Sequence, residues 1–264
     1  MDIRAPCAHV CSMGSRPVFS PLTGRGPMLL WLRPQAALGN TAVYRATSSM
    51  KKQIRQLLRH RDLDGLADLA ERKRRALGQL ISLTFDSDPL VGWRAVEAMG
   101  VAADRIAEDD PDHVRQHLRR LYWLLSEESG GICWRAPEGM AEIVRRRPRM
   151  FDDYVSIIVS LIGQMAEEDL AYFRPGILWS IGRLGPLAEK EIDAAEPEIN
   201  ASLDHHDPQV RGIAAWCLGQ CGRGQLLAGR EDLLSDQCPV DLFEDGDLVC
   251  LTVGELTRRV RVAD

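Results

Sequence analysis

The side chains of this chain best suited to chemistry are tryptophans, arginines and glutamates that recur at matching positions in similar segments. Arg94 directly follows Trp93, and Glu97 lies four residues after that tryptophan, a spacing that places Trp93 and Glu97 on one face of a helix. Trp and Arg are the residue types that most often anchor protein interfaces, so the pattern predicts partner recognition, and we assign no catalytic residue. The predicted partner-binding residues are Trp93, Arg94, Glu97, Trp134, Arg135, Glu138, Trp179, Arg183 and Trp216.

A second candidate chemistry is metal binding by cysteine and histidine. Cys217 and Cys221 stand four residues apart, with a histidine pair at 205–206 upstream and Cys238 downstream. Such a set could hold zinc or an iron–sulfur cluster. However, Cys217 aligns with Ala98 in the repeat described below, a position for a small buried residue where free cysteine packs well. We therefore predict neither a metal site nor a cofactor.

Two basic runs, 72–75 and 145–149, could bind phosphate or an acidic partner. Each falls at an expected helix end or loop, where cations complement the helix dipole and stay solvated. We interpret both runs as solvated surface. The sequence contains no Gly-rich phosphate loop, no serine nucleophile elbow and no HExxH zinc helix.

The elements that must position these residues are internal repeats. The segment 88–100 aligns without gaps to 207–219, and shorter matches occur at 134–140 and 173–182. Equivalent positions are Gly100, Ala141, Gly182 and Gly219, spaced by 41, 41 and 37 residues. Four units of nearly constant length indicate a repeat protein.

The residue types in the repeat predict a helix with defined ends. An Asp-Pro pair opens the first and fourth copies, because Asp caps free backbone N–H groups and Pro suits the first helical turn. The closing glycine is expected to end the helix in the left-handed conformation. Pro137 interrupts the second copy, so that helix either kinks there or begins later. One such unit cannot bury its apolar face alone, and the units must stack.

The pattern D-P-x-V-x-x-x-A-x-x-[A/C]-[L/M]-G resembles the HEAT-like repeat family, including the short variety named after phycobilisome lyases. The resemblance covers about residues 70–223 and implies an all-α fold. The expected architecture is an α-solenoid, or α-α superhelix, of about four HEAT-like helix pairs with a small C-terminal β-hairpin cap. The family includes scaffolds, adaptors and a few enzymes, so the fold alone does not select a function.

In the HEAT-like arrangement the second helix of each pair lines the concave face, which would place the recurring Trp, Arg and Glu residues in a groove. We predict that the chain is a non-enzymatic scaffold or adaptor that binds a protein partner there. Packing of these tryptophans between adjacent repeats remains the alternative for that site. The alternative function is a HEAT-like enzyme of the bilin-lyase or DNA base-excision kind, with a pocket near Glu97, Glu138 and Trp179.

The composition sets the domain boundaries. Residues 1–49 contain five prolines and no sustained helical or strand period, so a disordered or extended segment is expected. An N-terminal helical cap at 50–71, the repeats at 72–223 and a C-terminal cap at 224–264 follow. Within the last segment, apolar runs at 240–243 and 247–251 flank Asp245-Gly246, a strong hairpin signal that precedes a short helix.

Charge and cysteine content restrict the partners. The net charge is −5, and residues 186–264 carry 16 acidic against seven basic side chains, which makes nucleic acid an unfavoured partner. No stretch approaches the roughly 18–20 apolar residues that span a bilayer, so no membrane association is predicted. Seven cysteines in no regular framework suggest reduced thiols and a cytoplasmic location. The expected partner is a protein of unknown identity.

Overall fold

A computed structural model describes residues 49–125, 135–167 and 173–263 of the chain. The chain divides after Ser49 into two units, and the description below concerns the second, Met50–Asp264. The extended segment expected at 1–49 lies outside the described residues except for Ser49.

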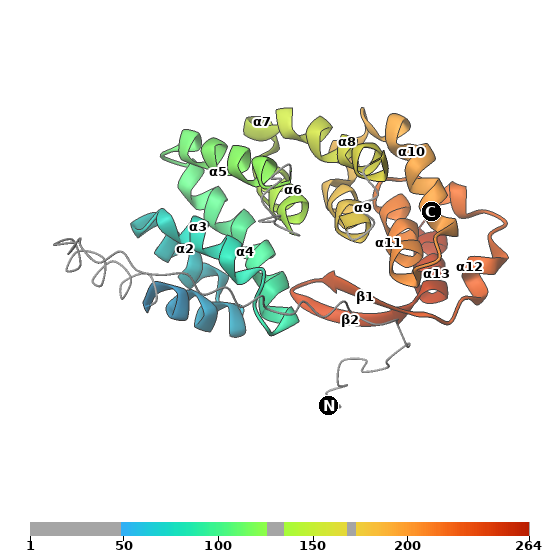
Figure 1. The fold of residues 1–264 in the computed structure, drawn as a ribbon, viewed down its shortest axis with the longest axis horizontal. Helices are drawn as coiled ribbons and strands as arrows, with labels where there is room; N and C mark the ends of the chain where they lie inside the picture. The colour runs from blue at the N-terminus through green and yellow to red at the C-terminus, as the bar shows by residue number, and fades with distance from the viewer. Residues whose placement is uncertain (1–48, 126–134, 168–172, 264) are drawn as a thin grey trace, which may run out of the picture. The chain divides into compact units, whose positions relative to one another are not determined.

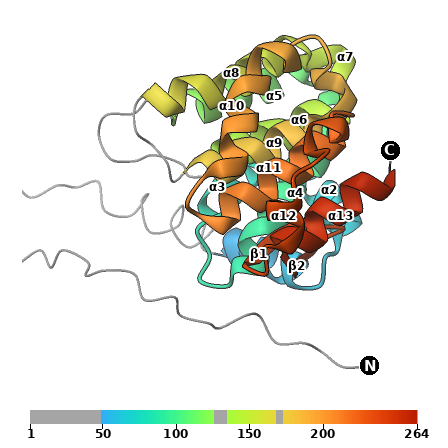
Figure 2. The same ribbon diagram turned by 90° about the vertical axis from the view of Figure 1, so that its right-hand side faces the viewer.

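The second unit is a row of helices covered along one side by a second helical layer (Figures 1 and 2). Each helix of the inner row contacts the next one. The inner row consists of α2 (Leu63–Arg72), α4 (Pro89–Ala107), α6 (Ala136–Arg146), α9 (Arg174–Leu184), α11 (Pro208–Gln220) and α13 (Val253–Ala263). This arrangement confirms the predicted all-α solenoid, because α4, α6, α9 and α11 hold the four copies found in the sequence.

The remaining helices precede or connect members of the inner row. A helix over residues 49–59 comes before α2. The second layer contains α3 (Arg75–Leu83), α5 (Pro111–Trp123), α7 (Pro148–Phe151), α8 (Asp153–Glu167) and α10 (Ile192–Ala201). Shorter segments are η2 (Gly185–Ala188), η3 (Ser202–Asp204), η4 (Gly224–Leu227) and α12 (Glu231–Ser235). No helix of the described ranges is long and apolar enough to cross a membrane.

The starts of the inner helices follow from their sequences. Asp88 accepts a hydrogen bond from the Leu90 amide, and Asp207 accepts one from the Gln209 amide, so both Asp-Pro pairs open a helix as predicted. The helix of the second copy begins later, at Ala136, which places Pro137 in its first turn rather than in its interior. Its N-cap residue makes no side-chain capping bond.

The expectation for the repeated glycine was wrong. Gly100 and Gly182 lie within α4 and α9 and do not adopt a left-handed conformation. Their function is close approach between neighbouring helices. A Cβ at Gly100 would lie 2.6 Å from the Glu142 carbonyl oxygen of α6, and one at Gly182 would overlap the Trp216 ring of α11. The residue at this repeat position must be small because the inner helices are tightly packed there.

The predicted hairpin is present as β1 (Pro239–Glu244) and β2 (Asp247–Thr252), paired antiparallel. Glu244 pairs with Asp247 across a two-residue turn, in which Asp245 and Gly246 both have positive φ, the signature of a type I′ turn. Figure 1 shows that the strands run back from α13 along the inner row, with the turn near α4. The hairpin therefore contacts helices far from the C-terminal end of the stack.

Contacts at both ends hold the hairpin in place. At the turn, Arg94 donates to the Gly246 carbonyl (2.9 Å) and to the Asp247 carboxylate (2.9 Å). In the middle, the Trp179 indole donates to the Phe243 carbonyl at 3.1 Å. At the start of β1, the Gln209 side chain both donates to and accepts from the Asp241 backbone. These bonds tie one hairpin to α4, α9 and α11.

Candidate functional site

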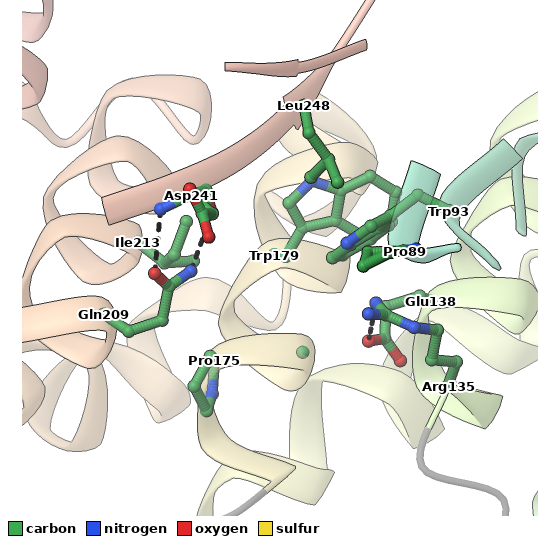
Figure 3. Close-up of a pocket in the computed structure, with 11 residues that line it drawn as sticks. Pro89, Trp93, Arg135, Glu138, Pro175, Trp179, Gln209, Ile213, Asp241 and Leu248 are labelled. Atoms are coloured by element: carbon green, nitrogen blue, oxygen red, sulfur yellow. Dashed lines mark hydrogen bonds and ion pairs between the residues drawn. The ribbon is translucent and has the colours of Figure 1, made fainter. Parts of the chain in front are cut away.

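A pocket of about 500 Å³ lies where the hairpin passes the first two turns of four inner helices (Figure 3). This volume is within the range of small-molecule and side-chain binding sites. The lining residues come from α4, α6, α9, α11 and both strands. They are Pro89, Trp93, Arg135, Glu138, Pro175, Gly176, Trp179, Gln209, Ile213, Asp241 and Leu248.

One wall of the pocket is aromatic. The Trp93 and Trp179 rings are 4.8 Å apart between centroids and tilted by 57°. Phe243 stacks on Trp93, with centroids 5.3 Å apart and the planes within 9°. The Arg135 guanidinium lies 3.9 Å from the Trp93 ring centroid, a cation–π contact. Trp93 and Trp179 line the pocket, and Phe243 of β1 packs against both rings without lining it.

Glu138 is the titratable group of the site. It lies in the first turn of α6 and is only 2% exposed. Its Oε1 is 3.5 Å from Arg135 Nη1, whereas its Oε2 has no hydrogen-bond partner among the described residues. Burial raises the pKa of this carboxyl from 4.5 to about 7, and the nearby Arg135 only partly opposes that rise.

A glycine makes room for the Glu138 carboxyl group. Gly176 lies in the first turn of α9, and a Cβ there would lie 2.5 Å from Glu138 Oε1. The aligned positions hold arginine in the first two copies, Arg94 and Arg135. The third copy thus differs from the first two at Gly176, the residue that lies against the buried Glu138 of the second copy. This departure opens the pocket between α6 and α9.

The opposite wall is formed by α11 and the hairpin. Figure 3 shows Gln209 and Asp241 facing Arg135 and Glu138 across the pocket. Ile213 and Leu248 contribute apolar surface, and the Asp241 side chain is exposed. With Glu138 ionised, the lining side chains carry two negative charges and one positive charge. The site therefore combines aromatic faces with a small excess of negative charge.

The other predicted site residues do not line this pocket. Arg94 binds the hairpin turn, and Glu97 is 2.7 Å from Arg61 in an ion pair. Arg183 pairs with Glu142 at 2.7 Å. Trp216 is 5% exposed and packs against Gly182, between α11 and α9. The sequence left open whether the tryptophans line a groove or pack between adjacent repeats, and Trp216 packs between repeats.

Trp134 was also predicted to bind the partner, and it lies outside the described residues. The predicted residues that meet at the pocket are Trp93, Arg135, Glu138 and Trp179. No pattern in the sequence predicted the wall formed by Gln209, Asp241 and Leu248. The Asp-Gly turn predicted the hairpin itself, but no local signal states which helices a hairpin will cross.

The cysteines considered as metal ligands do not gather with the histidines. Cys217 is buried, and the Cys221 thiol donates weakly to the Ile181 carbonyl at 3.8 Å. A side-chain hydrogen bond between Cys217 and Cys221 lowers the pKa of the Cys221 thiol. The same bond, together with burial, raises the pKa of the Cys217 thiol. In the described part of the chain, no three His, Cys, Asp or Glu side chains are placed to share a metal ion.

Comparisons with known proteins give limited likenesses. No family model matches this chain. An uncharacterized protein of Archaeoglobus fulgidus is 32% identical over 105 residues, which are 40% of this chain and 51% of that protein. The chain thus matches about half the length of this curated relative. A solved structure of computationally designed armadillo repeat proteins for modular peptide recognition has a TM-score of 0.41 and 18% identity, covering 80% of this chain and 97% of that one. Neither likeness assigns a family, so the HEAT-like resemblance stays a prediction.

Proposed function

We propose that this chain is a non-enzymatic recognition module that binds a segment of a partner protein along the inner helical row. A basic side chain of that segment would enter the pocket between α6, α9 and the hairpin. The observation that carries the proposal is the Glu138 carboxyl group, which is buried at the pocket and whose Oε2 has no hydrogen-bond partner within residues 49–125, 135–167 and 173–263. We place this function in the cytoplasm, because the seven cysteines of the sequence form no regular disulfide framework.

A basic side chain fits the pocket better than an apolar or acidic one. A buried carboxylate without a partner costs free energy, and a cation that reaches it relieves that cost. The half-buried Trp93 and the edge of the buried Trp179 line the pocket with Glu138, and Asp241 adds a second carboxylate on the opposite wall. Aromatic faces next to carboxylates are a favourable setting for ammonium and guanidinium groups.

The test is an array of pentapeptides that differ only at the central residue: Lys, Arg, norleucine or Glu. We expect the full chain to bind the Lys or Arg peptides and to discriminate against norleucine and Glu. Glu138→Gln should weaken binding by about 10- to 100-fold, the range of an interface hot spot. The matched control is Glu189→Gln, an exposed glutamate that does not line the pocket.

The affinity for the basic peptide should depend on pH. Because the pKa of Glu138 is about 7, the carboxyl group loses its proton as the pH rises from about 6 to 8. The cation requires the ionised form, so we expect the dissociation constant to fall across this window in calorimetric titrations. Equal binding of the norleucine and Lys peptides, or an affinity that weakens with rising pH, would contradict the proposal.

A second candidate is an enzyme of the base-excision or bilin-lyase kind, which one observation favours. A carboxyl group with a pKa of about 7 beside a 500 Å³ pocket is suited to general acid–base catalysis at neutral pH. The test is release of a damaged base from an alkylated oligonucleotide, or transfer of a bilin to an acceptor protein. Turnover that is lost in Glu138→Gln would favour the enzyme, whereas peptide binding without turnover favours the recognition module.

A further inference from the structure

A second pocket, of about 410 Å³, lies between α3 and α5 and is lined by different residues from the first. It contains three guanidinium groups, two imidazoles and two side-chain amides, and none of its lining residues is acidic. The lining residues are Arg74, Arg75, Gly78, Gln79, His113, Gln116, His117 and Arg120. Two of the arginines belong to the basic run 72–75, which the sequence analysis interpreted as solvated surface.

His117 provides a buried and unsatisfied polar atom in this pocket. The side chain lies on α5 and is 7% exposed, and its Nε2 has no hydrogen-bond partner among the described residues. Burial, reinforced by Arg120 and His113, lowers the pKa of the imidazole to about 3. Native proteins pair nearly all such buried atoms, so an unpaired nitrogen on a side chain that lines a pocket is a reason to look for a ligand there.

The arginines of the pocket are only partly neutralised by the protein. Arg74 forms an ion pair with Asp110, the N-cap residue of α5. Arg75 and Arg120 have no hydrogen bond or ion pair from their side chains to any described residue, and Arg120 Nη1 lies 4.0 Å from the Cβ position of Gly78. Two guanidinium groups from facing helices therefore reach the same cavity without a carboxylate between them.

The start of α3 adds to the positive potential. Arg74 is the N-cap residue and makes no capping hydrogen bond, and Arg75 is the first residue of this helix of nine residues. A helix N-terminus carries a partial positive charge and favours an anion. Arginine at that end is unfavourable by itself, because like charges meet. An anion in the pocket would relieve this repulsion and give His117 Nε2 a partner.

We propose that the pocket between α3 and α5 binds a phosphate group. Arg75 and Arg120 hold the phosphate oxygens in charge-assisted hydrogen bonds, the pairing that suits a guanidinium fork. His117 Nε2 contacts a phosphate oxygen from the buried side. The cavity is larger than one phosphate ion requires, so the phosphate can be a free ion or can belong to a phosphorylated small molecule.

The test titrates the full chain with inorganic phosphate and with O-phosphoserine, in about 150 mM chloride to screen weak surface binding. Imidazole signals of His117 are followed by NMR, and affinities are measured by calorimetry. We expect a saturable shift of the His117 signals. Arg75→Gln and Arg120→Gln should each weaken binding at least about tenfold. Both arginines are exposed, so these variants are expected to fold.

The control is Arg119→Gln, which removes the same charge from the neighbouring exposed residue of α5, outside the pocket. Its affinity should match that of the unmodified chain. Tighter binding of O-phosphoserine than of phosphate would assign the site to phosphorylated molecules, and the reverse order would assign it to the free ion. The proposal is overturned if millimolar phosphate leaves the His117 signals unchanged, or if Arg119→Gln weakens binding as much as Arg120→Gln.

Discussion

At the scale of single residues, two buried glutamates one turn apart on α6 have opposite environments. Glu142 is fully buried, and its two oxygens accept from Arg183 and Arg145 at 2.7 and 2.9 Å. Glu138 is almost as buried, but it has one long contact to Arg135, and its second oxygen meets no hydrogen-bond partner in the described part of the chain. A buried charge is tolerated when it is paired and hydrogen-bonded. Glu142 therefore links α6 to α9 through Arg183, whereas Glu138 is available for a ligand.

The raised pKa of Glu138 predicts a pH-dependent stability. Between the ordinary pKa of 4.5 and the folded value of about 7, the folded chain holds a proton that the unfolded chain has lost. The free energy of unfolding should therefore fall as the pH rises through this window. Glu138→Gln removes the titrating carboxyl group. Relative to the unmodified chain, the variant should therefore gain about 3 kcal/mol in the free energy of unfolding between pH 4.5 and 8. Urea denaturation at several pH values measures the difference.

The exposed Glu189→Gln serves as the control for this series. It removes the same carboxyl group from an exposed position outside the pocket. A difference that stays constant with pH for Glu138→Gln would mean that the Glu138 carboxyl is as well solvated as an exposed one, and the candidate site would lose its main feature.

At the scale of elements, close contacts between inner helices depend on residues without a side chain. The prediction of a helix-ending glycine failed because a local pattern cannot distinguish a glycine that ends a helix from one that touches a neighbour. The Asp-Pro starts could be predicted, since a cap is formed within four residues. The contact at Gly100 is made with α6, about 40 residues further along the chain. It could therefore be recognised only once the packing of the helices was known.

Gly100→Ala is therefore expected to destabilise the fold. Alanine is a better helix former than glycine by up to about 1 kcal/mol, but its Cβ would lie 2.6 Å from the Glu142 carbonyl oxygen, and backbone cannot move aside as a side chain can. We expect a net loss of about 1–3 kcal/mol, typical of overpacking. The midpoint of urea denaturation, followed by circular dichroism, measures this loss.

Gly163→Ala in α8 is the matched substitution for this experiment. Gly163 also lies within a helix, and a Cβ there would have no atom within 4 Å. This variant should be equally stable or slightly more stable than the unmodified chain. If both variants gained stability, α4 and α6 would not be as close as described.

At the scale of the whole described unit, the candidate site joins segments distant in sequence. The repeat spacing could place Trp93, Glu138 and Trp179 on successive helices of the inner row, and these three residues line one pocket. The wall from Asp241 and Leu248 could not be predicted. The hairpin is not a copy of the repeat, so the repeat spacing does not indicate which helices it contacts. Arg94 contacts residues 152 and 153 positions away, a separation that local patterns do not encode.

The hairpin should couple the stability of the two ends of the row. Phe243→Ala removes the ring that stacks on Trp93 and contacts Trp179, at a cost of about 3–5 kcal/mol. We expect faster amide hydrogen exchange in α2 and α4 as well as in the strands, measured by mass spectrometry under conditions where the variant stays folded.

Leu256→Ala provides the comparison at the other end. Leu256 is fully buried on α13 and lies near Gly212 of α11, so its truncation should accelerate exchange in α11 and α13 and leave α2 unchanged. An identical exchange pattern for both variants would show that the unit opens as a whole, without a specific link through the hairpin.

The position of the hairpin also sets the order in which the pocket can be completed during synthesis. Gly246 leaves the ribosome 152 residues after Arg94, which at about 5–20 residues per second is a delay of roughly 8–30 s. Throughout that interval α4 with Trp93 lacks the strands that cover its ring, and α9 with Trp179 lacks them during the later part. Nascent chains therefore present a large aromatic surface to chaperones before the finished protein can present a pocket to a partner.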